Sequence, residues 1–441
     1  MSGEEKNLEL LPVELLQQIF QYLDAAFLIH NVKLVCRRFY ILLSDESFWR
    51  HKLLGGQQDG CLQERRVLVG LGVAAGAGEH PGVVRFRPLS REPGWSDVCY
   101  REAVEKALWT RHPIHKTVLA EPHYAPIDAL QLFGNGACVT GGRDRILAVW
   151  GPEGGTTPLA VDAKRHTGWV WDVATPPQIR HQPSHFYSCA WDSTVVQWNV
   201  RESALEPVCS RFTTHPGLCA GCWEGVVAVG LSVPKVALID TRLAVEGACA
   251  SFRAHTRAVT GLHLYDYLVV SISEDRSLWA TDLRNMACPL AKVEVEGMLP
   301  EGGEGTPAHP RSLTRCRNIY YVGDTRGGLH LINSTSGEYK HDVFYPCVAQ
   351  RSITGLAATL STLTVGSLDK TVRIFSMVGT CPELITEWTM NGEVTGLDYN
   401  GEILAVATTD NSASLYKPNH GTPEPTIEPE SKEICNEQGD H

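Results

Sequence analysis

The sequence predicts a multidomain α+β chain in which a helical N-terminal segment precedes a seven-bladed all-β propeller. Three observations support this fold class: amphipathic helical spacing over residues 8–53, helical spacing again near 95–109, and a turn-and-strand signature that recurs between 116 and 417. Repeats of roughly 40–45 residues are typical of four-stranded blades, which bury their faces only against neighbouring blades. The repeated unit therefore predicts a closed ring.

Length and composition are those of a large globular protein. Of the 441 residues, 43% are hydrophobic and 20% are charged, which suits a chain with a sizeable core. The net charge of −11 argues against nonspecific phosphate binding, so we expect no nucleic-acid partner. The longest apolar run is too short to span a bilayer, so we expect no membrane partner.

The cysteine and histidine patterns indicate neither disulfides nor a metal site. The 14 cysteines show no paired spacing and the amino end has no signal-peptide pattern, which favours free thiols in the cytoplasm or nucleus. Cys219 and Cys222 form an isolated CxxC, and the histidines lack the spacing of a hydrolytic zinc site. We expect no metal, no cofactor and no catalytic residue, since nucleophile-elbow and phosphate-loop motifs are absent from the sequence.

The repeated signature is an aspartate in a tight turn followed, six residues later, by an aromatic residue. Asp144 precedes Trp150 in this way, and Asp192 precedes Trp198. The same register passes through seven positions: Asp144, Asp192, Val233, Asp275, Arg326, Asp369 and Asp410. Seven positions at roughly blade-length spacing predict seven blades.

A second signal accompanies several of these turns. A histidine precedes a short apolar strand, and a hydroxyl residue lies four positions before the aspartate. A buried carboxylate is tolerated where its lone pairs are filled, and histidine, hydroxyl and turn amides can fill them. Three units carry the set: His123, Thr140, Asp144 and Trp150; His166, Ser188, Asp192 and Trp198; and His255, Ser271 and Asp275, with Thr281 at the aromatic position. Units three and five lack an aspartate at the register position.

This pattern resembles the WD-repeat family, whose blades bury a His–Ser/Thr–Asp–Trp hydrogen-bond relay. The resemblance implies that the histidine, hydroxyl, aspartate and tryptophan residues are structural. It also implies a closed propeller, and we expect the strand near residues 116–120 to complete the last blade.

Residues 10–50 carry a second resemblance. They contain Leu-Pro, Glu-Leu-Leu, Tyr-Leu, Val-Cys-Arg-x-Phe and Phe-Trp in the order and spacing of a three-helix F-box. Its first helix is expected to begin near Pro12, because the fixed φ of proline suits a first helical turn. Apolar residues then follow helical spacing at Leu15, Leu16, Ile19, Phe20 and Leu23.

The two patterns together resemble the F-box/WD-repeat family and cover most of the chain. The resemblance implies a non-catalytic substrate-recognition subunit of an SCF-type cullin–RING ubiquitin ligase. The F-box would bind the ligase adaptor and, through it, the cullin–RING core, while the propeller would bind a target protein of unknown identity. Adaptor binding is expected from an apolar set: Leu11, Pro12, Leu15, Leu16, Ile19, Leu23, Leu34, Val35 and Cys36.

The register of the repeats also predicts a substrate-binding surface on the narrower face of the propeller. Its expected residues are Arg143, Trp169, Trp171, Trp191, Glu274, Thr325, Leu368 and Thr409. Exposed tryptophans are frequent binding hot spots, although at least one of the two that alternate at 169 and 171 is expected to pack between blades. Arg143 is the only basic member, so a multi-arginine phosphate pocket is not predicted.

The expected domains are an F-box at 8–53, a linker at 54–115 with a helix near 95–109, the propeller at 116–417 and a disordered tail at 418–441. Two other functions remain open. A non-catalytic WD-repeat scaffold would bury Leu15 and Ile19 against the propeller. An enzyme would show carboxylates or histidines that converge on the central channel.

Overall fold

The computed structural model describes residue 8, residues 11–54 and most of residues 94–418. Within the last range, the residues left undescribed are 120, 134–135, 152–154, 156, 177–184, 202–203, 244–248, 298–306, 336 and 379–380. The linker expected between 55 and 93 and the tail expected beyond Pro418 therefore lie outside the described residues.

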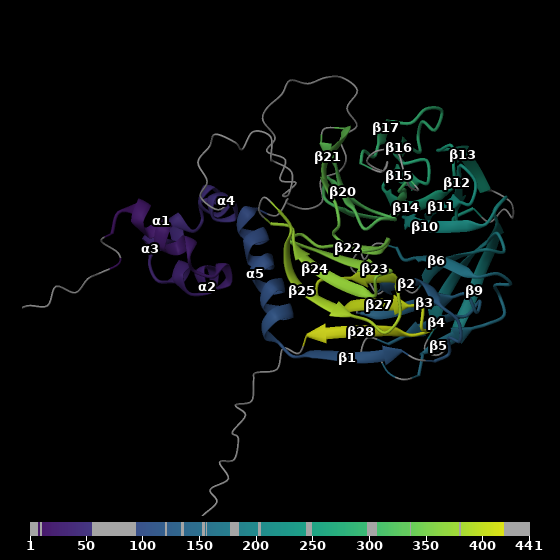
Figure 1. The fold of residues 1–441 in the computed structure, drawn as a ribbon, viewed down its shortest axis with the longest axis horizontal. Helices are drawn as coiled ribbons and strands as arrows, with labels where there is room; N and C mark the ends of the chain where they lie inside the picture. The colour runs from purple at the N-terminus through teal and green to yellow at the C-terminus, as the bar shows by residue number, and fades with distance from the viewer. Residues whose placement is uncertain are drawn as a thin grey trace, which may run out of the picture.

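The described strands form seven antiparallel four-stranded sheets, which are the blades of a propeller. Figure 1 shows these strands on one side of a long helix. The predicted count of seven blades is confirmed. Blade 1 contains β2 (Ile127–Phe133), β3 (Ala137–Gly142), β4 (Leu147–Trp150) and β5 (Ala160–Asp162); blade 2 contains β6 (Val170–Ala174), β7 (His185–Ala190), β8 (Thr194–Arg201) and β9 (Ala204–Phe212); blade 3 contains β10 (Gly217–Trp223), β11 (Val226–Leu231), β12 (Lys235–Asp240) and β13 (Cys249–Arg253).

The remaining blades continue in chain order around the ring. Blade 4 contains β14 (Val259–Tyr265), β15 (Leu268–Ser273), β16 (Ser277–Asp282) and β17 (Ala291–Glu294); blade 5 contains β18 (Pro310–Cys316), β19 (Ile319–Asp324), β20 (Leu329–Thr335) and β21 (Glu338–Tyr345); blade 6 contains β22 (Ile353–Ala358), β23 (Thr362–Ser367), β24 (Thr371–Ser376) and β25 (Glu383–Thr389).

Blade 7 is built from both ends of the propeller sequence. Its inner three strands are β26 (Val394–Tyr399), β27 (Leu404–Thr408) and β28 (Ala413–Pro418), and its outer strand is β1 (Ile114–Leu119). The register of β1 on β28 runs from Ile114 opposite Pro418 to Leu119 opposite Ala413. The strand expected to complete the last blade is therefore confirmed.

Side-chain hydrogen bonds join the first strands of neighbouring blades, which are the inner strands of the ring. In four blades a hydroxyl of the first strand donates to the carbonyl of the first residue in the next inner strand. The pairs are Thr260 with Pro310, Ser312 with Ile353, Thr354 with Val394 and Thr395 with Ile127. These bonds satisfy carbonyls that would otherwise face the central channel, and they fix the spacing between blades.

Two buried aspartates make a related link between blades. Asp172 on β6 accepts a hydrogen bond from the amide of Ala220 at 2.8 Å, and Asp398 on β26 accepts one from Leu132 at 2.9 Å. Burial raises the pKa of Asp172 to about 7 and also raises that of Asp398, while the backbone amides oppose the shift. Their oxygens are thus used in joining blades 2 to 3 and 7 to 1.

Between residues 11 and 54, the F-box region contains four α-helices and the 3-10 turn η2. Their bounds are α1 (Val13–Gln21), α2 (Ala25–His30), η2 (Val32–Leu34), α3 (Arg37–Leu42) and α4 (Glu46–Leu54). Pro12 directly precedes α1, and Asp24 caps α2 by accepting from two amides of its first turn. Phe48 and Trp49, which follow the three predicted helices in sequence, lie on the fourth helix.

The helix α5 (Trp95–Arg111) joins the F-box region to the propeller, and Figure 1 shows it between the two. Cys99, near its start, belongs to the F-box core, whereas Leu108 and Trp109, near its end, belong to the core of blades 6 and 7. The Trp109 indole donates to the Tyr399 hydroxyl at 3.0 Å. One helix thus contributes to two hydrophobic cores.

Polar contacts reinforce both ends of α5. Glu46 of α4 accepts from the amide of Trp95 at 2.6 Å, so a carboxylate lies at the positive N-terminus of the helix. Glu105, in the second half of α5, is buried against blade 6 and accepts hydrogen bonds from Thr359 and Thr362. Burial raises the pKa of Glu105, and the two hydroxyls oppose that shift. A buried carboxylate is strongly destabilising without its donors, and here blade 6 supplies them. The contact therefore favours one placement of α5 against the propeller.

Replacing Trp109 with alanine should loosen α5 from the propeller, because truncating a large buried aromatic side chain costs about 3–5 kcal/mol. Hydrogen–deuterium exchange of residues 95–111 should become faster. Leu290, an exposed residue of blade 4, provides the control, and Leu290→Ala should leave this exchange unchanged. If the exchange of residues 95–111 were unchanged in the Trp109→Ala variant, Trp109 would not hold α5 against the propeller.

Candidate functional site

Two exposed apolar sets occur on the F-box region. Leu15 and Ile19 lie one turn apart on α1 and are 45% and 39% exposed, while Leu34 and Val35 at the end of η2 are 74% and 64% exposed. Pro12 is also exposed. Exposed large apolar side chains of this kind are candidates for an interaction surface.

The expected adaptor set is not uniformly exposed. Leu16 is fully buried in the F-box core, and Leu11, Leu23 and Cys36 are half-buried against it. Leu16 and Phe20 form the inward stripe of α1, so the expectation that Leu16 contacts a partner is corrected. Helical spacing identifies the apolar residues of α1 but does not separate two neighbouring apolar stripes.

Sequence reasoning missed several exposed apolar residues of the same region. They are Tyr22, Phe27, Tyr40 and Ile41. The sequence carried a signal for these residues. Each lies close in sequence to an apolar residue that is buried in a short amphipathic helix, and the two cannot point to the same side of that helix. Tyr22 follows α1, Phe27 lies on α2, and Tyr40 and Ile41 lie on α3.

Blade 1 contains the complete predicted relay. His123 contacts Asp144 through Nδ1 at 3.0 Å and the Thr140 hydroxyl through Nε2 at 2.9 Å. The Trp150 indole donates to the same hydroxyl at 3.0 Å. Asp144 also accepts from the amides of Tyr124 and Ile146, so each oxygen of this buried carboxylate has donors.

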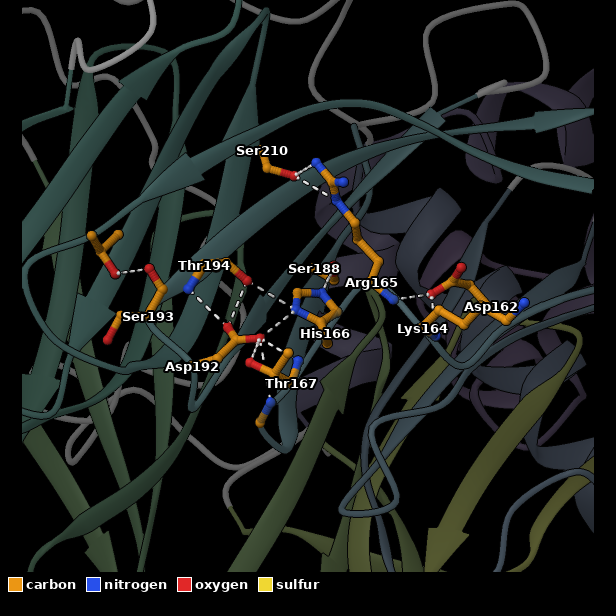
Figure 2. A network of polar contacts seen from close by, with 12 residues as sticks. Asp162, Lys164, Arg165, His166, Thr167, Ser188, Asp192, Ser193, Thr194 and Ser210 are labelled. Carbon is orange, nitrogen blue, oxygen red and sulfur yellow. Dashed lines mark hydrogen bonds and ion pairs between the residues drawn. The ribbon is translucent and has the colours of Figure 1, made fainter.

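Blade 2 brings the corresponding residues together, and Figure 2 shows His166 with Ser188, Asp192 and Thr194. The Ser188 hydroxyl lies 2.6 Å from Nε2 of His166 and 2.8 Å from the Trp198 indole nitrogen. His166 Nδ1 faces both Asp192, at 3.4 Å, and the Thr194 hydroxyl, at 3.0 Å. Burial acts to raise the pKa of Asp192, but hydrogen bonds from His166 and Thr194 outweigh it and hold the pKa below its ordinary value.

Blade 4 has the relay without its tryptophan. His255 contacts Ser271 at 2.9 Å and Asp275 at 3.2 Å, and Thr281 occupies the aromatic position as a buried residue. The Trp279 ring lies 5.3 Å from the His255 ring, but its buried nitrogen has no hydrogen-bond partner among the described residues. The histidine and carboxylate contacts thus persist without the indole donor.

Blade 5 contains a rearranged version that sequence reasoning missed. Arg326 occupies the register position, but Asp324, two residues earlier, is fully buried and accepts from the amides of Arg326 and Gly328. Its other oxygen lies 3.0 Å from Nε2 of His330, which comes from the third strand rather than from the loop before the first. Unit five therefore lacks an aspartate only at the register position.

The antiparallel order of each blade places the turn between its second and third strands at the same end as the connection into its first strand. We call this end the top face. In blade 2, Trp169 precedes β6, Trp171 lies on β6 and Trp191 lies in the turn between β7 and β8. The three belong to one end of one blade.

These tryptophans form a cluster. Ring centroids are 6.3 Å apart for Trp169 and Trp171, 5.6 Å for Trp171 and Trp191, and 6.5 Å for Trp169 and Trp191. Trp169 and Trp191 are 44% and 47% exposed, whereas Trp171 is half-buried and lines the central channel. Such rigid, partly exposed aromatic groups can bury a large area on binding at little entropic cost.

The relay of blade 2 positions this cluster. Asp192 accepts from the amides of Thr167 and Gly168 at 2.7 and 3.3 Å, and the amide of Trp191 donates to the carbonyl of Trp169 at 2.8 Å. A Cβ at position 168 would lie 2.5 Å from the amide nitrogen of Asp192, so this close approach requires glycine. The buried carboxylate therefore holds together the two loops that carry the exposed tryptophans.

Arg143 of blade 1 lies beside the cluster. Its guanidinium binds both oxygens of Asp128, at 2.7 and 3.1 Å, and lies 5.4 Å from the centre of the Trp169 ring. Hydrogen bonding to Asp128 raises the pKa of Arg143. The arginine expected on this face is thus already paired with a carboxylate and an aromatic ring.

The other four expected top-face residues lie in blades 4 to 7 and do not contact the tryptophan cluster. Glu274 pairs with Arg257 at 3.1 Å. Thr325 accepts from the amide of His309, and Thr409 accepts from that of Glu393, both through their hydroxyls. These residues and half-buried Leu368 each come from a different blade, so they do not form one compact site.

The central channel is a cavity of about 520 Å³ lined by residues from the inner strands of all seven blades. Three carboxylates line it, but Asp128 pairs with Arg143, and Asp172 and Asp398 accept backbone amides of neighbouring blades. Within the described part of the chain, no group of three or more histidine, cysteine, aspartate or glutamate residues could hold a metal. Nor is any helix there long and apolar enough to cross a membrane.

Family models match both parts of the chain. One described as F-box-like matches residues 8–54, and one described as WD domain, G-beta repeat matches residues 158–199, which include most of blade 2. With the seven-bladed ring, these matches give the architecture of F-box/WD-repeat proteins. The family resemblance expected from the motifs is confirmed.

Named relatives combine the same two modules. The chain is 28% identical over 295 residues to F-box/WD repeat-containing protein mec-15 of Caenorhabditis elegans, a match that spans 64% of this chain and 66% of the worm protein. It is 25% identical over 423 residues to F-box/WD repeat-containing protein 9 of Bos taurus, which spans 92% of this chain and 82% of that protein. The human protein of that name is 26% identical over 84% of this chain and 74% of its own length.

The relay of blade 2 predicts a specific dependence of stability on pH. The folded-state pKa of Asp192 lies below its unfolded value, so its stabilisation is present above about pH 4 and is lost as pH falls through the folded pKa. The difference in free energy of unfolding between the wild type and Asp192→Asn, measured by urea denaturation, should therefore shrink below about pH 4.

A neutral residue on the outer strand of blade 1 supplies the control. Val161 is exposed and does not ionise, so the difference caused by Val161→Ala should not change with pH. If the difference between the wild type and the Asp192→Asn variant stayed constant from about pH 6 to about pH 3, the ionised carboxylate would not stabilise this turn.

Proposed function

We propose that this chain is the substrate-recognition subunit of an SCF-type cullin–RING ubiquitin ligase, acting in the cytoplasm or nucleus. The F-box region would bind the ligase adaptor, and the propeller would bind the target protein. The observation that carries the proposal is the exposed apolar surface of Leu15, Ile19, Leu34 and Val35 on an F-box-like region that is joined to a WD-repeat propeller. The described cysteines are free thiols, which supports a reducing compartment.

The exposed residues suit a helix-in-groove contact. Leu15 and Ile19 lie at i and i+4 on α1, so they can enter a groove together as one apolar ridge. Leu16 and Phe20 form the neighbouring stripe, which packs in the F-box core. The helix can therefore present its outer stripe to a partner without giving up its own packing.

Exposure also separates this proposal from its nearest rival. A scaffold whose F-box segment packs internally would bury Leu15 and Ile19 against the propeller. Both side chains are instead open to solvent, and contact with the propeller is made through α5. This observation favours an external partner for α1.

The contribution of the chain to ubiquitin transfer would be proximity rather than catalysis. The matched families, F-box-like and WD domain, are not enzyme families. Helix α5 shares the F-box core at Cys99 and the propeller core at Trp109, so a target held on the propeller would keep a defined distance from the ligase. Such positioning raises the effective concentration of a target lysine near the charged conjugating enzyme.

Adaptor binding gives the direct test. The double variant Leu15→Asp/Leu34→Asp places charges on both exposed apolar sets and should reduce co-purification of the adaptor by about tenfold or more. Affinity purification from cells with cullin neddylation blocked, followed by mass spectrometry, measures this recovery.

The matched control is Leu243→Asp, because Leu243 on blade 3 is also half-exposed, at 49%. It should recover adaptor and cullin at the wild-type level. Circular dichroism should show that both variants keep the strand signal of the propeller. Adaptor recovery by the double variant equal to that of the wild type would exclude this F-box surface as the binding site.

A further inference from the structure

The mouth of the central channel contains an arginine without a partner among the described residues. Arg311 is the second residue of β18 and lines the channel cavity at its top end. In the part of the chain that the structure describes, no carboxylate, carbonyl or hydroxyl forms a hydrogen bond or ion pair with its guanidinium. Burial lowers the pKa of Arg311, while the more distant carboxylates of Asp128 and Glu274 oppose this shift. A desolvated, uncompensated cation of this kind favours an anionic ligand.

Three other arginines of the top face are already paired with carboxylates. Arg143 is bound to Asp128, Arg257 to Glu274, and Arg351 to Glu393 across blades 6 and 7. Among the described residues that line the channel cavity, Arg311 is the arginine near the top end. A single guanidinium matches one carboxylate, whereas a phosphate dianion is normally held by several cationic groups.

One member of the tryptophan cluster shares a cavity with Arg311. Trp171 of blade 2 and Arg311 of blade 5 both line the channel, and Trp171 is in contact with the exposed rings of Trp169 and Trp191. Arg143 already lies over the Trp169 ring, so a second cation is repelled rather than attracted there. The charge and the apolar surface therefore favour an acidic ligand with a large apolar group.

We propose that the top face binds an unmodified linear segment of the target protein that carries one acidic side chain close to a bulky apolar or aromatic one. The carboxylate pairs with Arg311 in the channel mouth, and the apolar group packs on Trp169 and Trp191. This inference rests on the proposed function, because it assigns the kind of target that the receptor takes.

The segment is extended where it crosses from the channel to blade 2. The mouth of the channel is lined by backbone and by threonine side chains whose hydroxyls already donate to neighbouring blades. These hydroxyl oxygens can still accept hydrogen bonds from the backbone amides of a bound peptide. The acidic and the apolar side chains of the segment then determine which sequences bind. The threonines accept the backbone of any such sequence.

A library of random dodecapeptides displayed on phage, selected on the full chain, tests this inference. Enriched peptides should share an aspartate or glutamate a few residues from tryptophan, phenylalanine or leucine. In fluorescence anisotropy, Trp169→Ala/Trp191→Ala should weaken binding of a synthetic enriched peptide by about tenfold or more. Arg311→Gln should bring the acidic peptide and its amide counterpart to equal affinity.

The control variant is Tyr267→Ala, since Tyr267 is a half-exposed aromatic residue in the turn between β14 and β15, at the opposite end of the ring. It should bind the peptide as the wild type does. A consensus without an acidic residue, binding that survives both top-face variants, or much tighter binding when phosphoserine replaces the acidic residue would each overturn the inference.

Adaptor co-purification, measured on the same preparations, keeps the two proposals apart. If the adaptor is recovered but the peptide results fail, the assigned target chemistry is wrong and the receptor role stands. If the adaptor is not recovered, the receptor role itself fails, whatever the peptides show. The top-face variants should recover adaptor at the wild-type level, since the F-box surface is unchanged in them.

Discussion

The pairing of β1 with β28 is the constraint on which the remaining structure depends. It supplies the outer strand of blade 7 and so closes the ring of blades, each of which is stable only between two neighbours. It also positions the helices, because α5 ends at Arg111 and β1 begins at Ile114. The strand that closes the propeller therefore also fixes the position of the helix that carries the F-box.

Within the closed ring, buried polar groups determine local geometry. The carboxylates of Asp144, Asp192 and Asp275 are each surrounded by a histidine, hydroxyl groups or turn amides, and each holds the loop before a blade against a turn within that blade. In blade 2 this arrangement places Trp169 beside Trp191. Satisfying a structural carboxylate thus also shapes the surface that we assign to binding, because the same loop serves both.

Much of this architecture could be predicted from the sequence. The spacing of Asp144, Asp192 and their counterparts is sufficient for seven blades, since each buried aspartate and tight turn leaves a local signature. The order of motifs from Leu11 to Trp49 is sufficient for an F-box. Both predictions depend on short-range patterns that survive in a single sequence.

What could not be predicted depends on contacts between distant segments. Leu16 has the same helical spacing as Leu15, and only the packed core shows which of them faces inward. The link of Asp324 with His330 reverses the usual order of histidine and aspartate, so no register search finds it. Arg311 gains its significance from lacking a partner among the described residues, and that depends on where Asp128 and Glu274 point in other blades.

Assembly of blade 7 from distant segments has a consequence for synthesis of the protein. The strand that ends at Leu119 is made long before its partner, which begins at Ala413. At about 5–20 residues per second, the ribosome needs on the order of 15–60 seconds to reach that partner. During that interval β1 remains an open edge able to pair with other chains. A pause in translation late in the message would prolong this exposure, so elongation rate becomes a determinant of yield.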